Sequence, residues 1–152
     1  SETDRRAGER RLFDSVLVDA PCTGTGTMRR HPEIPWRLLP EDIDRDMPGL
    51  QLALLTEAAR RVRPGGQLIY ATCSVLQQEN AAVVDAFLNS EVGRGFALAP
   101  VSQAPIFERP EFAEAAAYVR SQETNRGLFQ TVPALGSFVG HFCARFVRRK
   151  TA

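Results

Sequence analysis

The chain has 152 residues, a length typical of a single domain. Apolar residues make up 43% and charged residues 24%, which excludes a disordered chain and allows a buried core. The net charge is only +1, so bulk charge does not predict nucleic-acid binding, and any such contact must be local or depend on parts outside this chain. Residues 1–11 lack the apolar run of a signal peptide and are expected to form a disordered tail, and no apolar stretch predicts a membrane span.

Three widely spaced cysteines, Cys22, Cys73 and Cys143, occur along the chain. The odd number and the lack of a Cys-x-x-Cys pair argue against a disulfide scaffold and against a structural zinc site. Free thiols indicate a reducing compartment, and we therefore expect a cytoplasmic protein.

The first half of the chain is predicted to contain two strands separated by a helix. Residues Phe13–Ala20 form an apolar run typical of a strand buried on both faces. Residues 21–40, which contain glycines and prolines, predict a long loop. A helix is expected from Glu41 to the Arg63–Gly66 segment, and Gln67–Cys73 predicts the second buried strand.

The apolar side of the first helix is predicted from a repeat of four residues, with Leu50, Leu54 and Ala58 inward and Val62 at the end. The second half of the chain continues with further elements. In chain order, we expect a helix over 79–90, a linker over 93–109 with a short strand at 96–98, a helix over 110–122, and strands over 128–132 and 138–147.

This alternation predicts an α/β fold in which a doubly wound sheet carries helices on both faces. A strand–helix–strand unit leaves its two strands parallel, and neighbouring strands lie about 5 Å apart. Ligand sites of such sheets lie beyond the carboxyl ends of the strands. Asp19 and Cys22 follow the first strand and Cys73 ends the second, so we expect two thiols and a carboxylate in one crevice.

A thiol at a strand end is a candidate nucleophile if its pKa is lowered from the usual value of about 8.5. A nearby cation or the N-terminus of the helix after Cys73 would favour the thiolate. The alternative, that Cys73 is a small buried apolar residue, is equally supported by the pattern alone. For Cys22, which lies in a loop, that alternative is slightly weaker.

Three segments carry a resemblance to a known family. They are Asp19–Gly26 (DAPCTGTG), Arg29–Trp36 (RRHPEIPW) and Tyr70–Asn80 (YATCSVLQQEN), the last of them preceded by Pro64-Gly65-Gly66. In order and spacing they resemble the DAPCSGTG, RRHPDIxW and PGG…YATCSVLxxEN motifs of Sun/Fmu-type RNA cytosine-5 methyltransferases. The resemblance is close over residues 12–90 and looser beyond them. Thr23 stands where the family usually has serine, which keeps the hydroxyl.

The resemblance implies a Rossmann-like sheet that depends on S-adenosylmethionine, and a covalent mechanism. Cys73 would attack C6 of a cytosine, and C5 would then accept the methyl group. Cys22 would assist loss of the C5 proton and release of the product. Asp19 would hydrogen-bond the cytosine and lie near the methionine end of the cofactor, and the Pro21 carbonyl would accept a hydrogen bond from the exocyclic amine. The cytosine must leave its stack to reach these groups.

Other polar residues are candidates for contact with RNA, for which the family suggests ribosomal RNA. Arg29, Arg30 and His31 would contact phosphates, or else form a solvated loop. Trp36 would stack on a base, although such a residue more often fills the edge of a core. We expect structural roles for His141 and Cys143 and a solvated tail for the remaining basic group, Arg145, Arg148, Arg149 and Lys150.

The family's glycine-rich cofactor loop and acidic ribose-binding residue precede the segment that resembles Asp19, and neither is found in the eighteen residues before it. We therefore expect residues 1–152 to be one partial domain, the C-terminal half of the catalytic sheet, which binds no cofactor and is inactive alone. Its first strand should then expose an apolar edge and favour self-association. Two alternatives remain open, a non-catalytic module of the same fold and a generic α/β domain with buried cysteines.

Overall fold

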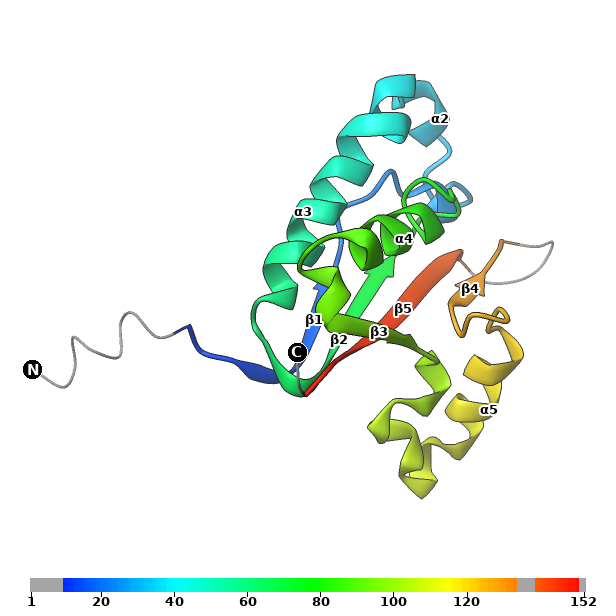
Figure 1. The fold of residues 1–152 in the computed structure, drawn as a ribbon. Coiled ribbons are helices and arrows are strands. Elements are labelled where there is room, and N and C mark those ends of the chain that lie inside the picture. Colours follow the sequence, from blue (N-terminus) through cyan, green and yellow to red (C-terminus); the bar gives the residue numbers. More distant parts are fainter. Residues whose placement is uncertain (1–9, 134–138, 151–152) are drawn as a thin grey trace, which may run out of the picture.

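A computed structural model describes residues 10–133 and 139–150, and most of the tail expected over residues 1–11 lies outside the described part. The chain forms a five-stranded sheet (Figure 1). Its strands are β1 (Phe13–Asp19), β2 (Val62–Thr72), β3 (Phe96–Ala99), β4 (Phe129–Thr131) and β5 (His141–Arg148), in the spatial order β1-β2-β5-β3, with β4 paired to β5.

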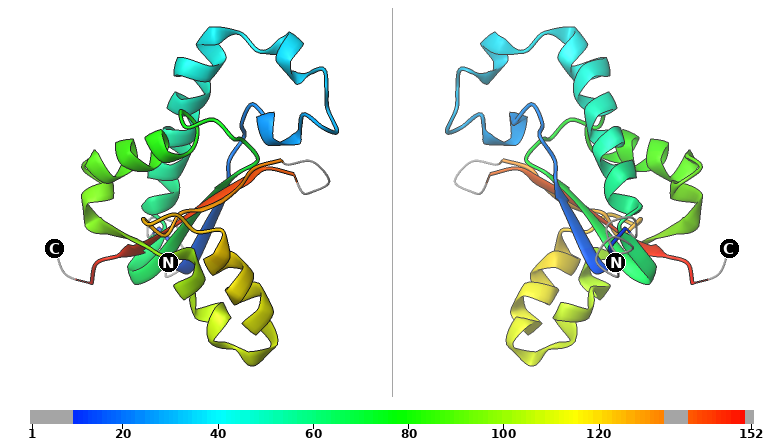
Figure 2. Two further views of the ribbon diagram at one scale, coloured as in Figure 1. Left: turned by 90° about the vertical axis from the view of Figure 1, so that its right-hand side faces the viewer. Right: turned by 90° about the vertical axis from the view of Figure 1, so that its left-hand side faces the viewer.

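Helices cover both faces of this sheet, as predicted (Figure 2). Helices α3 (Met47–Ala59) and α4 (Ala81–Asn89) pack on one face, and α5 (Ala113–Ser121) lies on the other. The short helix α2 (Ile34–Arg37) lies in the long connection between β1 and α3, which the sequence predicted as a loop. Within the described part of the chain, no helix has the length and apolar character needed to cross a membrane.

The pairing of β1 with β2 sets the position of the site. The two strands are parallel, with Asp19 opposite Ala71, so both carboxyl ends lie at the same edge of the sheet. The crossover between them runs through α3. Strand β5 then pairs antiparallel with β2, with Phe142 opposite Thr72, and brings the segment before His141 to this same edge.

The core lies between the sheet and the α3–α4 layer. Tyr70, Phe142 and Phe146 are almost fully buried from β2 and β5, and Phe87 of α4 packs on Phe146 with ring centroids 5.0 Å apart. Edge-on aromatic packing of this kind adds to the free energy gained from burying the rings. This core holds β2 and β5 in the centre of the sheet.

The prediction that the first strand is buried on both faces is wrong. No residue of β1 is buried, and Leu17 is 65% exposed. The strand lies at one end of the sheet path, and α3 packs against it. An apolar run is typical of a buried strand, but the run itself does not show whether neighbours are present on each side.

The predicted inward face of the first long helix is wrong by one residue. Gln51, Leu55 and Ala59 are the buried positions of α3, whereas Leu50 and Leu54 are 46% and 39% exposed. The buried face carries a polar residue, Gln51, whose amide is bound at the site described below. Hydropathy alone assigned that residue to the solvent side.

Two further expectations about basic and glycine-rich segments are also wrong. The Arg63–Gly66 segment does not stop the helix, because α3 already ends at Ala59 and β2 begins at Val62. Arg145 is not part of a solvated tail: it is 8% exposed, and its Nε donates to Oε1 of Gln67 at 2.7 Å. Arg148 likewise donates from its guanidinium to the Val62 carbonyl.

Candidate functional site

Two thiols meet at the carboxyl edge of the sheet. Cys22 follows β1, Cys73 follows β2, and their sulfur atoms lie 3.2 Å apart. Parallel pairing of the two strands produces this contact between residues 51 positions apart, which confirms the prediction that the thiols share one crevice. Asp19 is exposed at the end of β1, in register with Ala71, two positions before Cys73.

The surroundings of Cys22 keep this thiol protonated. Burial raises the pKa of Cys22 to about 12, and its hydrogen bond with Cys73 acts in the same direction. Cys22 therefore keeps its proton at neutral pH and has the Cys73 sulfur as its neighbour at 3.2 Å. The site thus contains a proton-holding thiol, Cys22, in contact with a second thiol.

A buried carboxylate joins the loops that carry the two cysteines. Oε1 of Glu79 accepts hydrogen bonds from the Thr23 backbone N–H at 2.8 Å and from Nε2 of Gln51 at 3.0 Å. Its Oε2 accepts from the Thr23 hydroxyl at 2.7 Å and from the Ser74 hydroxyl. Glu79 is fully buried and bonds the residue after each cysteine, so it fixes one thiol relative to the other.

Sequence reasoning assigned no function to Glu79 or Gln51. Glu79 lies within the motif that carries the resemblance, and this was the available signal. Gln51 gave no such signal. It is a polar residue one position from the predicted apolar stripe, and only the folded chain brings it to Glu79. Thr23 supplies the hydroxyl that donates to Glu79, and the serine usual at this position in the resembling motif would supply the same group.

Further hydrogen bonds hold the backbone around Cys73. Asn80 accepts from the Thr72 hydroxyl at 2.6 Å and donates through Nδ2 to the Ser74 carbonyl at 2.8 Å. The Gly26 N–H donates to the Cys73 carbonyl at 2.9 Å. The backbone on both sides of Cys73 is therefore bonded to neighbouring segments, which restricts the positions its side chain can take.

Three segments approach one another closely at Gly26. The Gly140 N–H donates to the Gly26 carbonyl at 2.9 Å, in addition to the bond between Gly26 and Cys73. A Cβ atom at position 26 would lie 2.4 Å from the Gly140 oxygen and 2.6 Å from the Cys73 oxygen. No side chain fits there, so glycine is required for the segment before β5 to pack against both cysteine loops.

The Pro21 carbonyl accepts a hydrogen bond from Nε2 of Gln51 at 3.0 Å. A carbonyl oxygen has two lone pairs, so Pro21 can accept one more donor. Within the described residues, the buried Oε1 of Gln51 has no hydrogen-bond partner. The amide of Gln51 therefore orients toward Pro21 and Glu79 at the cost of one unsatisfied acceptor.

The predicted RNA-contacting residues lie on an exposed segment beside the thiols. Arg29, Arg30 and His31 are exposed, and His31 Nδ1 lies 3.5 Å from Glu33 Oε1. Trp36 of α2 is 89% exposed, which excludes the reading that it fills a core edge. Arg30 and His31 line a cavity of about 700 Å³ together with His141, which is exposed on β5.

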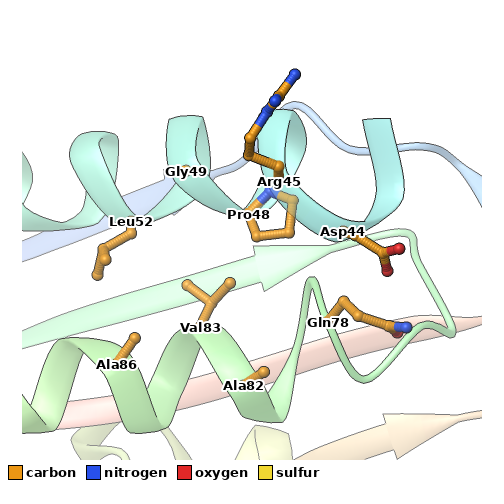
Figure 3. A pocket seen from close by; sticks show the side chains of 9 residues that line it. All are labelled: Asp44, Arg45, Pro48, Gly49, Leu52, Gln78, Ala82, Val83 and Ala86. Carbon is orange, nitrogen blue, oxygen red and sulfur yellow. The ribbon is translucent and has the colours of Figure 1, made fainter. Parts of the chain in front are cut away.

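A second cavity, of about 360 Å³, lies between α3 and α4 (Figure 3). Leu52 and Val83 face each other across it, and Asp44 and Arg45 lie at one end. Its lining includes neither cysteine nor any of the predicted site residues. In the part of the chain that the structure describes, no cluster of three histidine, cysteine or acidic residues could hold a metal ion.

Curated relatives match about half of the chain. The chain is 50% identical over 76 residues to ribosomal RNA small subunit methyltransferase B from Salmonella arizonae, a match covering 50% of this chain and 18% of that protein. It is 55% identical over 73 residues to the protein of the same name from Thermus thermophilus, covering 48% and 18%. The matches thus span less than a fifth of these relatives' length.

Solved structures resemble nearly the whole chain. The crystal structure of a protein designated PH0851 has a TM-score of 0.68 and 35% identity, and the match covers 93% of this chain and 28% of that one. NSun6 from Pyrococcus horikoshii, solved with SFG, has a TM-score of 0.67 at 21% identity, with coverage of 97% and 33%. The second likeness concerns the fold alone. Together they confirm the predicted Rossmann-like fold.

A family model described as 16S rRNA methyltransferase RsmB/F matches residues 1–130. This range contains β1 to β3, both cysteine loops and the Glu79 network. The chain therefore belongs to the RsmB/F family of 16S rRNA methyltransferases.

Proposed function

We propose that this chain forms the base-handling part of an enzyme that methylates C5 of a cytosine in RNA. Ribosomal RNA, which the names of the family and of the curated relatives specify, is the proposed substrate class. The observation that carries the proposal is the contact of 3.2 Å between the sulfur atoms of Cys22 and Cys73, together with the raised pKa of Cys22. Three free cysteines suit the cytoplasm as the proposed compartment.

Cys73 is the proposed nucleophile because its neighbour at 3.2 Å, Cys22, has a raised pKa and keeps its proton at neutral pH. Its sulfur adds to C6 of the cytosine, and the electron pair of the C5–C6 bond makes C5 nucleophilic toward the methyl group. In the second half of the reaction, Cys22 gives its proton to the departing Cys73 sulfur and takes the C5 proton in return. Both thiols end protonated, and the division into two steps lowers each barrier.

S-adenosylmethionine is the proposed cofactor and would supply the methyl group. Asp19, exposed at the end of β1, fits a contact with the amine at the methionine end. The glycine turn at Gly24–Gly26 does not fit a cradle for the rest of the cofactor, because Gly26 is buried against Gly140 and Cys73. The loop that holds the adenosine is therefore proposed to lie outside the described residues.

Several exposed groups surround the place where the cytosine would lie. Asp19 and the free lone pair of the Pro21 carbonyl would bind polar groups of the base. Residues on the segment after the Cys22 loop would contact phosphates or stack on a base, and these are Arg29, Arg30, His31 and Trp36. All four are exposed, as contact with a large substrate requires.

Covalent trapping tests this proposal on the full-length protein with S-adenosylmethionine and RNA containing 5-fluorocytosine, which blocks loss of the C5 proton. We expect an RNA–protein adduct that survives denaturation and is absent in Cys73→Ser. With unmodified RNA, Cys22→Ser should accumulate the same adduct because release fails.

Cys143→Ser is the matched control, since it removes a third free cysteine, on β5, and should behave as the wild type. An adduct that persists in Cys73→Ser would reject the assignment of the nucleophile. No adduct with any variant or with the wild type would favour a non-catalytic module.

A further inference from the structure

The cavity of about 700 Å³ beside the thiols has walls from three distant parts of the chain. Thr27 and Arg30 come from the segment after the Cys22 loop, Tyr118 comes from α5, and Phe129 and His141 come from β4 and β5. We call this cavity the Tyr118 pocket. Its lining includes Tyr118 of α5, and this helix lies on the face of the sheet opposite the α3–α4 layer (Figure 2).

The lining of the Tyr118 pocket combines aromatic and basic side chains. The Tyr118 ring packs edge-on against Phe129, with centroids 6.3 Å apart, and remains 44% exposed. Arg30, His31 and His141 add basic groups, and the lining that the structure describes includes no acidic residue. Outside this lining, Glu33 Oε1 lies 3.5 Å from Nδ1 of His31. Aromatic rings with cationic neighbours suit an unstacked base and its phosphate.

The pocket is joined to the reactive thiol through one glycine pair. Gly26 bonds to the Cys73 carbonyl on one side and accepts from the Gly140 N–H on the other. The residues that flank this pair, Thr27 and His141, line the pocket. Two residues of the pocket lining, Thr27 and His141, are therefore chain neighbours of the glycines that bond to the Cys73 backbone and to each other.

We propose that the Tyr118 pocket binds the nucleotide next to the target cytosine in single-stranded RNA, with its base stacked on Tyr118 and its phosphate contacted by Arg30. This inference rests on the proposed function, because it takes the target base to lie at Cys73. It adds a second recognition site that reads the unpaired state of the neighbouring nucleotide. Stacking of this kind tolerates any base, since every base has an aromatic face.

The test measures binding of a fluorescein-labelled single-stranded hexaribonucleotide with one cytosine to the full-length protein, by anisotropy. Tyr118→Leu should weaken binding by about 5-fold or more, the range found when a stacking ring is removed. Tyr118→Phe keeps the ring and should stay within about 2-fold of wild type.

Arg30→Ala should lower the slope of log affinity against log salt by about 0.7, as expected for one lost phosphate contact to a single strand. Arg60→Ala is its control: this exposed arginine follows α3, pairs with Glu57, and should leave the slope unchanged. Arg30 lies on an exposed segment, so its variant remains informative if Tyr118→Leu proves unstable.

Wild-type affinity in Tyr118→Leu and an unchanged salt slope in Arg30→Ala would overturn the proposal, and the pocket would then serve another ligand. The trapping reaction separates this result from failure of the proposed function. Cys73→Ser should bind the hexanucleotide as the wild type does and form no adduct. If Tyr118→Leu and Arg30→Ala weaken binding while neither the wild type nor any variant forms an adduct, the proposed nucleotide pocket is supported and the proposed methylation chemistry is rejected.

Discussion

At the scale of single residues, the candidate site depends on a buried carboxylate that bonds the residues following the two cysteines. Glu79 receives four hydrogen bonds, from Thr23, Gln51 and Ser74. A buried carboxylate is stable only when its oxygens are satisfied in this way. The same bonds set the relative position of Cys22 and Cys73, so stability and thiol geometry have one source.

Glu79→Gln should therefore destabilise the chain by about 3 kcal/mol. The amide replaces one acceptor oxygen with an NH2 group, so this donor faces other donors, and those donors lose the acceptor they had. Urea unfolding monitored by circular dichroism measures the change. Glu57→Gln provides the control: this carboxylate pairs with Arg60 at the surface and its loss should have little effect. An unfolding free energy in Glu79→Gln equal to that of wild type would contradict the network described for Glu79.

At the scale of elements, the site is built where three chain segments end against each other. The loops after β1 and β2 and the segment before β5 meet at Gly26, whose N–H and carbonyl bond to Cys73 and Gly140. The parallel pairing of β1 with β2 supplies the edge, and the antiparallel return of β5 closes it. The Tyr118 pocket and the thiol pair lie on either side of this junction.

Gly26→Ala should separate these segments, because its Cβ would lie 2.4 Å from the Gly140 oxygen. We expect a loss of about 2 kcal/mol in unfolding free energy and a weaker covalent adduct. Gly49→Ala is the opposite case, since this glycine lies in α3 with no atom within 4 Å of its added Cβ. It should stabilise the chain by about 0.5–1 kcal/mol. Equal melting temperatures for the two variants would refute this account.

At the scale of the whole molecule, the sheet has an exposed end at β1. Among the described residues this strand pairs only with β2, and Leu17 and Phe13 are 65% and 42% exposed on it. An apolar strand with an unpaired edge favours association with another strand. Helices α4 and α5 pack on other parts of the sheet and do not cover this edge of β1 (Figures 1 and 2).

We expect the chain to self-associate through this edge at high concentration, and Leu17→Lys to shift it toward the monomer by adding an edge charge. Size-exclusion chromatography with light scattering gives the mass of each form. Leu39→Lys changes a leucine that is 60% exposed in another part of the chain and should leave the mass unchanged. A wild-type monomer at every concentration tested would contradict the expectation.

Much of the fold was accessible from local patterns. The helix over Ala81–Asn89 and the two closing strands agree with the predicted ranges to within a few residues, and the second strand ends as predicted but begins earlier, at Val62. Their signals are strong because apolar periodicity and glycine or proline boundaries coincide. The inward face of α3 could not be obtained in this way, since its buried Gln51 is stabilised by hydrogen bonds to Pro21 and Glu79, which are distant in sequence.

The meeting of Cys22 and Cys73 followed from chain pattern alone, because parallel strands must end at the same edge of a sheet. The pattern left their protonation open. It could not show that burial raises the pKa of Cys22 to about 12, that Glu79 bonds both loops, or that His141 joins Tyr118 in one pocket. Burial and contacts between distant segments are properties of the packed chain, and local sequence carries no record of them.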